Sequence, residues 1–273
     1  MTVIDQDILY TIKEVSDLTG VNPVTLRAWQ RRYGLLTPLR TEKGHRLFRP
    51  EDIDRIHEIL AWLDKGVSVG KIKPLLEQSN QSIVQEQQAL EEVDEFLKHL
   101  AALNRSKAIA CLAEILKEYP YSTFYEKFFL YVEKRLLQGV LPHFNLQYSL
   151  WEALLTEQCG SVIHALNRIQ KDDCWVMHFG ENAKSLAWVT ALACANQQYR
   201  VTLLEGVQGK TAPLGKLLQE YPIKKIVLVG ENKLPEETLS GLVLLKKQLN
   251  CEVELVGSIH TIHFQRFYSD EFI

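Results

Sequence analysis

Long apolar segments are missing from this chain of 273 residues. No run of about eighteen apolar residues occurs, which is the length that a membrane-spanning helix needs. The first ten residues, MTVIDQDILY, carry two acids and no basic residue, so they lack the charge pattern of a secretory signal. We therefore expect a cytoplasmic protein with no membrane partner.

Clustered cysteines are missing as well. The chain has five cysteines, and none lies in a C-x-x-C pair or precedes a histidine at the spacing of metal ligands. They are Cys111, Cys159, Cys174, Cys194 and Cys251. We expect them to be buried apolar residues, and their spacing disfavours a metal or redox sensor. No nucleophile–base pair or carboxylate pair stands out, so we expect no enzyme activity, no metal and no cofactor.

Two short helices joined by a tight turn are predicted near the amino terminus. Thr11 caps the first helix and Gly20 ends it. Asn22 caps the second helix, in which Pro23 takes the first position, where its missing N–H is harmless. Gly34 ends this second helix. The pattern predicts a helix-turn-helix.

The outer face of the second helix carries the chemistry of DNA recognition. Apolar Val24 and Ala28 can face the first helix, which leaves polar side chains outside. These are Thr25, Arg27, Gln30 and Arg31. In a major groove Arg reaches guanine O6 and N7, Gln reaches adenine, and Thr touches a base or a phosphate. We expect Arg27 and Arg31 to carry the sequence readout.

Positive charge gathers in the same region. Between residues 22 and 49 there are seven basic residues and one acid, although the whole chain has a net charge of −3. A solvated charged surface is the alternative, but the surrounding helix-turn-helix favours phosphate binding. Residues 40–48, centred on Gly44, predict a hairpin or wing, and two further helices follow from Pro50 to Leu76. The side chains expected at phosphates are Arg32, Tyr33, Arg40, Lys43, His45 and Arg46. Trp29 could touch the DNA backbone or pack under the wing, and packing is favoured.

Residues 8–78 resemble the winged helix-turn-helix domain of the MerR family, through the segments TLRAWQRRYGLL, PLR and GHRLF. Together with the long carboxy-terminal extension, they look most like the MlrA type. The resemblance implies a homodimer that binds double-stranded promoter DNA at a pseudo-palindrome. It also implies an activator that distorts the promoter so that RNA polymerase can engage it. MlrA-type proteins are associated with curli and biofilm matrix genes and with regulatory protein partners of the cyclic-di-GMP pathway.

The remaining chain predicts two more domains. The polar residues 79–82 mark a joint, and residues 82–170 contain four segments with apolar positions at helical spacing, which predict a bundle. Its aromatic residues could line a ligand cavity but are more typical of a core. Residues 172–258 alternate apolar strands with helices, which predicts a doubly wound α/β domain with a parallel sheet. Residues 259–273 are expected to be a tail.

This bundle and sheet resemble the cobalamin-binding module of methionine-synthase type. That module carries the motif E/D-x-H-x-x-G after its first strand, with the histidine as a cobalt ligand. Here the aligned residues are Glu181, Ala183 and Leu186. His178 and His164 are expected to be core or surface residues, and the sheet is expected to lack one strand and one helix. We interpret the module as one that has lost cobalamin and serves as a sensory or interaction domain. The alternative is a functional small-molecule sensor, cofactor carrier or enzyme.

Overall fold

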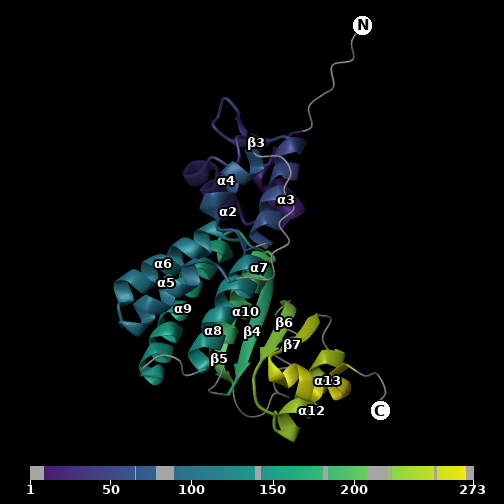
Figure 1. Ribbon diagram of the computed structural model, residues 1–273. Helices are drawn as coiled ribbons and strands as arrows, with labels where there is room; N and C mark the ends of the chain where they lie inside the picture. The colour runs from purple at the N-terminus through teal and green to yellow at the C-terminus, as the bar shows by residue number, and fades with distance from the viewer. Residues whose placement is uncertain are drawn as a thin grey trace. The chain divides into compact units, whose positions relative to one another are not determined.

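The computed structural model (Figure 1) describes residues 9–64, 66–77, 89–138, 143–180, 184–207, 221, 223–248 and 251–268. The chain divides into two compact units, Met1–Trp151 and Glu152–Ile273. The first contains the predicted DNA-binding domain and most of the predicted bundle, and the second contains the parallel sheet. The predicted joint at residues 79–82 lies outside the described residues.

The first unit begins with the predicted helix-turn-helix. Its elements are β1 (Tyr10–Thr11), α1 (Ile12–Thr19), α2 (Pro23–Ala28) and the π-helical turn η1 (Trp29–Tyr33). Thr11 and Glu14 cap α1 reciprocally: the Thr11 N–H donates to the Glu14 carboxylate at 2.7 Å, and the Glu14 N–H donates to Thr11 Oγ1 at 3.4 Å. Asn22 Oδ1 accepts the N–H of Val24 at 2.8 Å. The predicted caps are therefore confirmed.

The wing is a small antiparallel sheet. Strands β2 (Leu39–Arg40) and β3 (Arg46–Phe48) form the expected hairpin, and β1 adds a third strand that the sequence did not predict, in the order β1-β3-β2. Helices α3 (Pro50–Asp64) and α4 (Val69–Glu77) follow, as predicted. Ile56, Ile59 and Leu63 of α3 are fully buried, so one apolar stripe of this helix packs into the domain.

Most of the described residues in the predicted bundle lie in helices. Its elements are α5 (Glu92–Ala101), α6 (Arg105–Glu118), α7 (Tyr121–Phe124), η2 (Tyr125–Phe129), α8 (Leu130–Leu137) and α9 (Phe144–Asn167). The Phe96 ring meets the rings of Phe128 and Trp151 edge-on, with centroid separations of 5.1 and 5.3 Å. These three rings are fully buried, so the aromatic residues fill a core, as favoured above.

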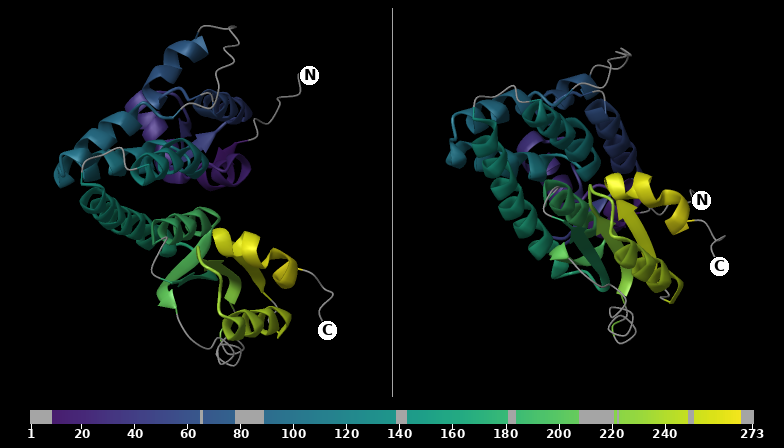
Figure 2. Two further views of the ribbon diagram at one scale, coloured as in Figure 1. Left: turned by 60° about the horizontal axis from the view of Figure 1, so that its bottom comes forward. Right: turned by 90° about the horizontal axis from the view of Figure 1, so that it is seen from below.

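The second unit contains a parallel four-stranded sheet in the order β5-β4-β6-β7. Its elements are β4 (Asp172–Phe179), α10 (Lys184–Asn196), β5 (Tyr199–Val207), β6 (Ile223–Val229), α12 (Glu236–Gln248), β7 (Glu252–Val256) and α13 (Ser258–Tyr268). Helices α12 and α13 share one core cluster with β4, β6 and β7 and lie together on one face of the sheet (Figure 2). The helix expected near Pro213 lies outside the described residues.

The expected tail is largely a helix, which corrects that prediction. Ile259, His263 and Phe267 of α13 are buried against the sheet. The Tyr268 hydroxyl oxygen accepts the N–H of Leu255, in the edge strand β7, at 3.1 Å. An edge-strand amide that would otherwise face outward is thereby satisfied. No helix in the described part of the chain is long and apolar enough to cross a membrane.

Candidate nucleic-acid interface

The recognition segment, α2 with η1, has two faces that differ in burial. Val24 and Arg31 are exposed and Arg27 is half-buried, and these residues lie three and four positions apart. Thr25 is only 2% exposed and Trp29 is fully buried, so a second stripe points into the protein. Thr25 was expected to contact DNA, and its burial corrects that prediction. The burial of Trp29 confirms that it packs in the core.

The recognition segment ends in a widened turn. The N–H groups of Gly34 and Leu35 both donate to the carbonyl of Trp29, the latter at 3.0 Å. Gly34 adopts a left-handed conformation with φ 59°, which suits glycine and ends the helix. The sequence predicted this end correctly, but it did not predict the π-helical geometry.

Arg46 joins the wing to the recognition segment. Its Nε donates to Gln30 Oε1 at 2.6 Å, so the expected base-reading amide of Gln30 holds a wing arginine instead. Arg46 Nη2 is buried and has no hydrogen-bond partner among the described residues. Burial lowers the pKa of Arg46, and the positive charges of Arg40, Arg31 and Arg27 lower it further.

We name these four guanidinium groups the arginine cluster (Arg27, Arg31, Arg40 and Arg46), because the charges of the other three act on Arg46, which is bonded to the recognition segment through Gln30. Like charges brought together at a surface repel one another, and an anion placed among them relieves the repulsion. The buried Arg46 Nη2 can in addition donate a hydrogen bond to an acceptor on a bound ligand. The cluster therefore has the charge and the unsatisfied donor that a polyanion such as DNA would match.

The tip of the wing extends this positive surface. Arg40, Lys43 and His45 are exposed, and Arg40 Nη1 donates to the Gly44 carbonyl at 3.3 Å. Thr41 Oγ1 accepts the N–H of His45 at 3.0 Å, which closes the turn. Gly44 has a φ of 81°, a backbone conformation that favours glycine. The structure thus places these three predicted phosphate contacts on one accessible hairpin.

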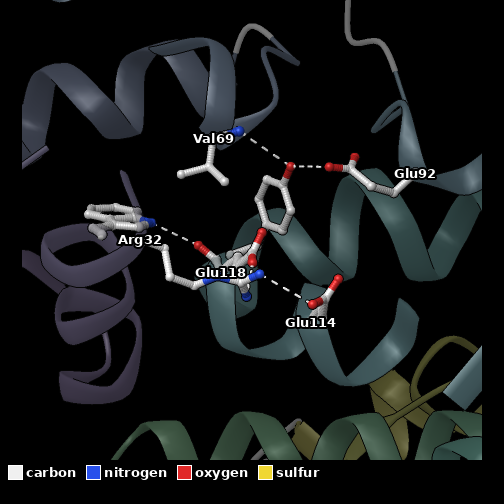
Figure 3. A network of polar contacts seen from close by, with 7 residues as sticks. Arg32, Val69, Glu92, Glu114 and Glu118 are labelled. Carbon is white, nitrogen blue, oxygen red and sulfur yellow. Dashed lines mark hydrogen bonds and ion pairs between the residues drawn. The ribbon is translucent and has the colours of Figure 1, made fainter. Parts of the chain in front are cut away.

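Arg32 and Tyr33 lie elsewhere. Arg32 forms an ion pair with Glu114 at 3.2 Å and another with Glu118, both on α6 (Figure 3). Burial and the neighbouring Glu118 carboxylate raise the pKa of Tyr33. Both residues are therefore engaged with the bundle, and the sequence alone gave no sign of these acidic partners more than eighty positions away.

Residues 10–79 match the family described as MerR HTH family regulatory protein. The chain is 35% identical over 225 residues to the HTH-type transcriptional regulator MlrA of Escherichia coli K12, covering 82% of this chain and 90% of that protein. The chain belongs to the MerR family, MlrA type. Its MerR-type domain makes it a DNA-binding transcriptional regulator.

Two other regulators show how far along the chain the similarity extends. MlrA of Salmonella typhimurium SL1344 is 36% identical over 196 residues, covering 72% of this chain and 79% of that protein. The HTH-type transcriptional repressor CarH of Myxococcus xanthus is 38% identical over 69 residues, covering 25% of this chain and 23% of CarH. The similarity to MlrA therefore extends well beyond the DNA-binding domain, whereas the match to CarH covers a length comparable to that domain.

Parallel sheets of this kind bind ligands beyond the carboxyl ends of their strands, so the residues there bear on the resemblance to a cobalamin-binding module. A Cβ atom on Gly257 would lie 2.5 Å from the Gly230 carbonyl oxygen, 2.8 Å from Glu231 Oε1 and 3.2 Å from Leu186 Cδ2, so these groups pack closely around Gly257 just after β7. Leu186 stands where the cobalamin motif has glycine, and glycine there allows a close approach of the ligand. Glu181 and Ala183 lie outside the described residues. Among the residues that are described, no group of three or more His, Cys, Asp or Glu could hold a metal ion.

Proposed function

We propose that this regulator binds promoter DNA with α2 and η1 in the major groove and the wing along the adjacent backbone. Arg27 and Arg31 read bases, because they lie on the accessible stripe of the recognition segment. Arg40, Lys43, His45 and Arg46 position the domain on phosphates. The observation that carries the proposal is that Arg46 of the wing is bonded to Gln30 of the recognition segment at 2.6 Å while its buried Nη2 lacks a partner among the described residues.

We further propose that two copies bind a pseudo-palindromic site, because a symmetric dimer places one recognition segment on each half-site. The resemblance to MlrA supports activation through RNA polymerase at promoters such as those of biofilm matrix genes. The carboxy-terminal half then serves as a sensory or protein-interaction module that does not use cobalamin. The close packing of Leu186 and Glu231 around Gly257, just after β7, supports this last point.

The test is a fluorescence-anisotropy titration of the full chain on a selected operator duplex between 50 and 200 mM salt. Each phosphate contact contributes about 0.9 to the slope of log affinity against log salt. Arg40→Ala and Arg46→Ala should each reduce the slope by about that amount per subunit, whatever the base sequence. Arg168→Ala, which removes an exposed arginine outside the DNA-binding domain, is the matched control and should leave the slope unchanged. Unchanged slopes in all variants would contradict the proposal.

Base readout is tested on the same duplex with single base-pair changes. Arg27→Ala should reduce discrimination at one position by about 1–3 kcal/mol, because a bidentate contact to guanine is lost. The other positions should keep their discrimination. A uniform loss at all positions would make Arg27 a phosphate contact and would remove it from the reading surface.

A further inference from the structure

The inward face of the recognition segment is attached to the end of helix α6. Trp29 Nε1 donates to the Glu118 carbonyl at 2.8 Å, and both groups are buried. Arg32 reaches the Glu118 carboxylate with one nitrogen and Glu114 Oε1 at 3.2 Å with the other. We name this set of contacts the α6 latch (Trp29, Arg32, Glu114 and Glu118). Figure 3 shows Arg32 extended toward the two labelled glutamates.

The residue after α6 continues the connection into the bundle. The Tyr119 hydroxyl donates to Glu92 Oε1 at 2.7 Å, and it accepts the N–H of Val69 at 3.4 Å. Val69 begins α4 and Glu92 begins α5, so the end of α6 is bonded to the recognition segment, to α4 and to α5. A shift of α6 along or about its axis must therefore move the recognition segment or break these contacts.

The burial of the Glu118 carboxylate makes its ion pair with Arg32 costly to break. The side chain of Glu118 is 10% exposed, whereas that of Arg32 is 46% exposed. Removing the arginine would leave a largely buried carboxylate without its countercharge, which is strongly unfavourable. The outward stripe with Arg27 and Arg31 takes no part in the latch, so it stays available for DNA while the inward stripe is held.

We propose that Arg32 is a positioning residue for DNA recognition, and that the bundle controls DNA affinity through the α6 latch. Arg32 does not contact DNA in this account. It fixes the angle at which α2 and η1 present Arg27 and Arg31, so a signal that rearranges α5 and α6 reaches the DNA through Glu118. The proposal rests on the function proposed above, in which α2 and η1 read the major groove.

The latch carboxylates can also be reached from the bundle side. A cavity of about 340 Å³ between α5 and α6 is lined in part by Glu92, Glu95, Glu114 and Glu118. Its walls thus include both acids that hold Arg32 and the acid that holds Tyr119. A change inside the bundle can act on these groups without passing through the DNA-facing surface.

The experiment measures operator affinity, its salt slope and the stability of the full chain for Arg32→Met, Glu118→Gln and the double variant. Each single variant should weaken operator binding about tenfold, and the double variant should be no weaker than either one, since all three break one interaction. The salt slope should stay at the wild-type value, because no phosphate contact is lost. Arg40→Met is the matched control: it removes a proposed phosphate contact outside the latch, so it should lower the slope by about 0.9 per subunit, and its loss of affinity should add to that of Glu118→Gln.

A charge exchange separates positioning from direct contact. Arg32→Glu alone should weaken binding strongly, and combination with Glu118→Arg should restore most of the affinity, because the ion pair is re-formed with its charges reversed. If Arg32 contacts phosphate, the exchange cannot restore affinity and Arg32→Met lowers the salt slope. If the latch is only structural, the variants lower stability while the folded protein binds DNA like wild type. Either result overturns the proposal. Wild-type protein that binds no operator would instead refute the function on which it rests.

Discussion

Substitution of Gln30 distinguishes two possible roles of its side chain, which are reading a base in DNA and holding Arg46 of the wing. Its Oε1 accepts the Arg46 Nε–H at 2.6 Å in a partly buried setting. Gln30→Ala removes that acceptor and leaves Arg46 free to move before DNA binds. Ordering one long side chain on binding costs about 0.5–1.5 kcal/mol, which corresponds to roughly a twofold to tenfold loss of affinity. We expect a loss of about fivefold, in the middle of that range.

The assay is anisotropy on a set of operator duplexes with single base-pair changes, at several salt concentrations. The loss in Gln30→Ala should be the same for every duplex, and the salt slope should be retained because Arg46 still reaches its phosphate. Arg46→Ala should lower the slope by about 0.9 per subunit, and adding Gln30→Ala to it should change nothing further. A loss of about 1–3 kcal/mol confined to duplexes with one particular A·T pair would show direct reading of adenine and refute this reasoning.

Three further predictions concern individual side chains. Burial, followed by the charges of neighbouring glutamates, raises the pKa of the Cys111 thiol to about 12. At pH 8 its alkylation should therefore be about a thousandfold slower than that of an ordinary thiol. Peptide mapping that finds Cys111 labelled rapidly would contradict this. Trp29→Phe should lower the free energy of unfolding by about 1–3 kcal/mol, because the Glu118 carbonyl loses its buried donor; urea unfolding measures the change. Burial, with Lys233 and Arg266, lowers the pKa of His263, whose ring nitrogen accepts the Leu234 N–H at 3.0 Å.

His263 is neutral in the folded protein, and this decides how its contribution to stability changes with pH. Below a pH of about 6.5 the unfolded chain takes up a proton that the folded chain resists, so the contribution of His263 to stability is full above that pH and is lost as the pH falls. His263→Gln keeps an acceptor for the amide and removes the titration. The stability lost between pH 7.5 and 5.5 should therefore be smaller in this variant, as measured by urea midpoints. An equal loss in both proteins would assign the pH dependence to other groups.

Local rules made the helical boundaries and strands predictable from sequence. Thr11, Asn22 and Gly34 act through hydrogen bonds and backbone angles within a few residues, so the sequence itself contains the relevant partners. The apolar strands β4 and β6 were predictable because a parallel sheet buried on both faces produces nearly continuous apolar runs. The same reasoning predicted a four-stranded sheet, which the described residues contain.

The features that the sequence did not predict depend on contacts between distant segments. Whether Thr25 faces DNA or the core depends on what packs against α2, and the sequence around Thr25 does not contain α6. Arg32 was expected at phosphate because it lies among arginines, yet its acids are 82 and 86 positions further along the chain. Helix α13 was missed because its polar residues hid a short buried stripe at Ile259, His263 and Phe267. Tertiary packing, rather than local propensity, set these outcomes.

We propose that α2 and η1, held from behind by α6, read a specific DNA sequence. The most direct measurement is the selection of fragments from a genomic pool by the full chain, carried out in parallel with wild type and Arg27→Ala. We expect wild type to enrich a pseudo-palindromic sequence, and Arg27→Ala to recover the same motif with one position relaxed in each half-site. Equal recovery of all fragments by both proteins, or no recovery at all, would contradict the account.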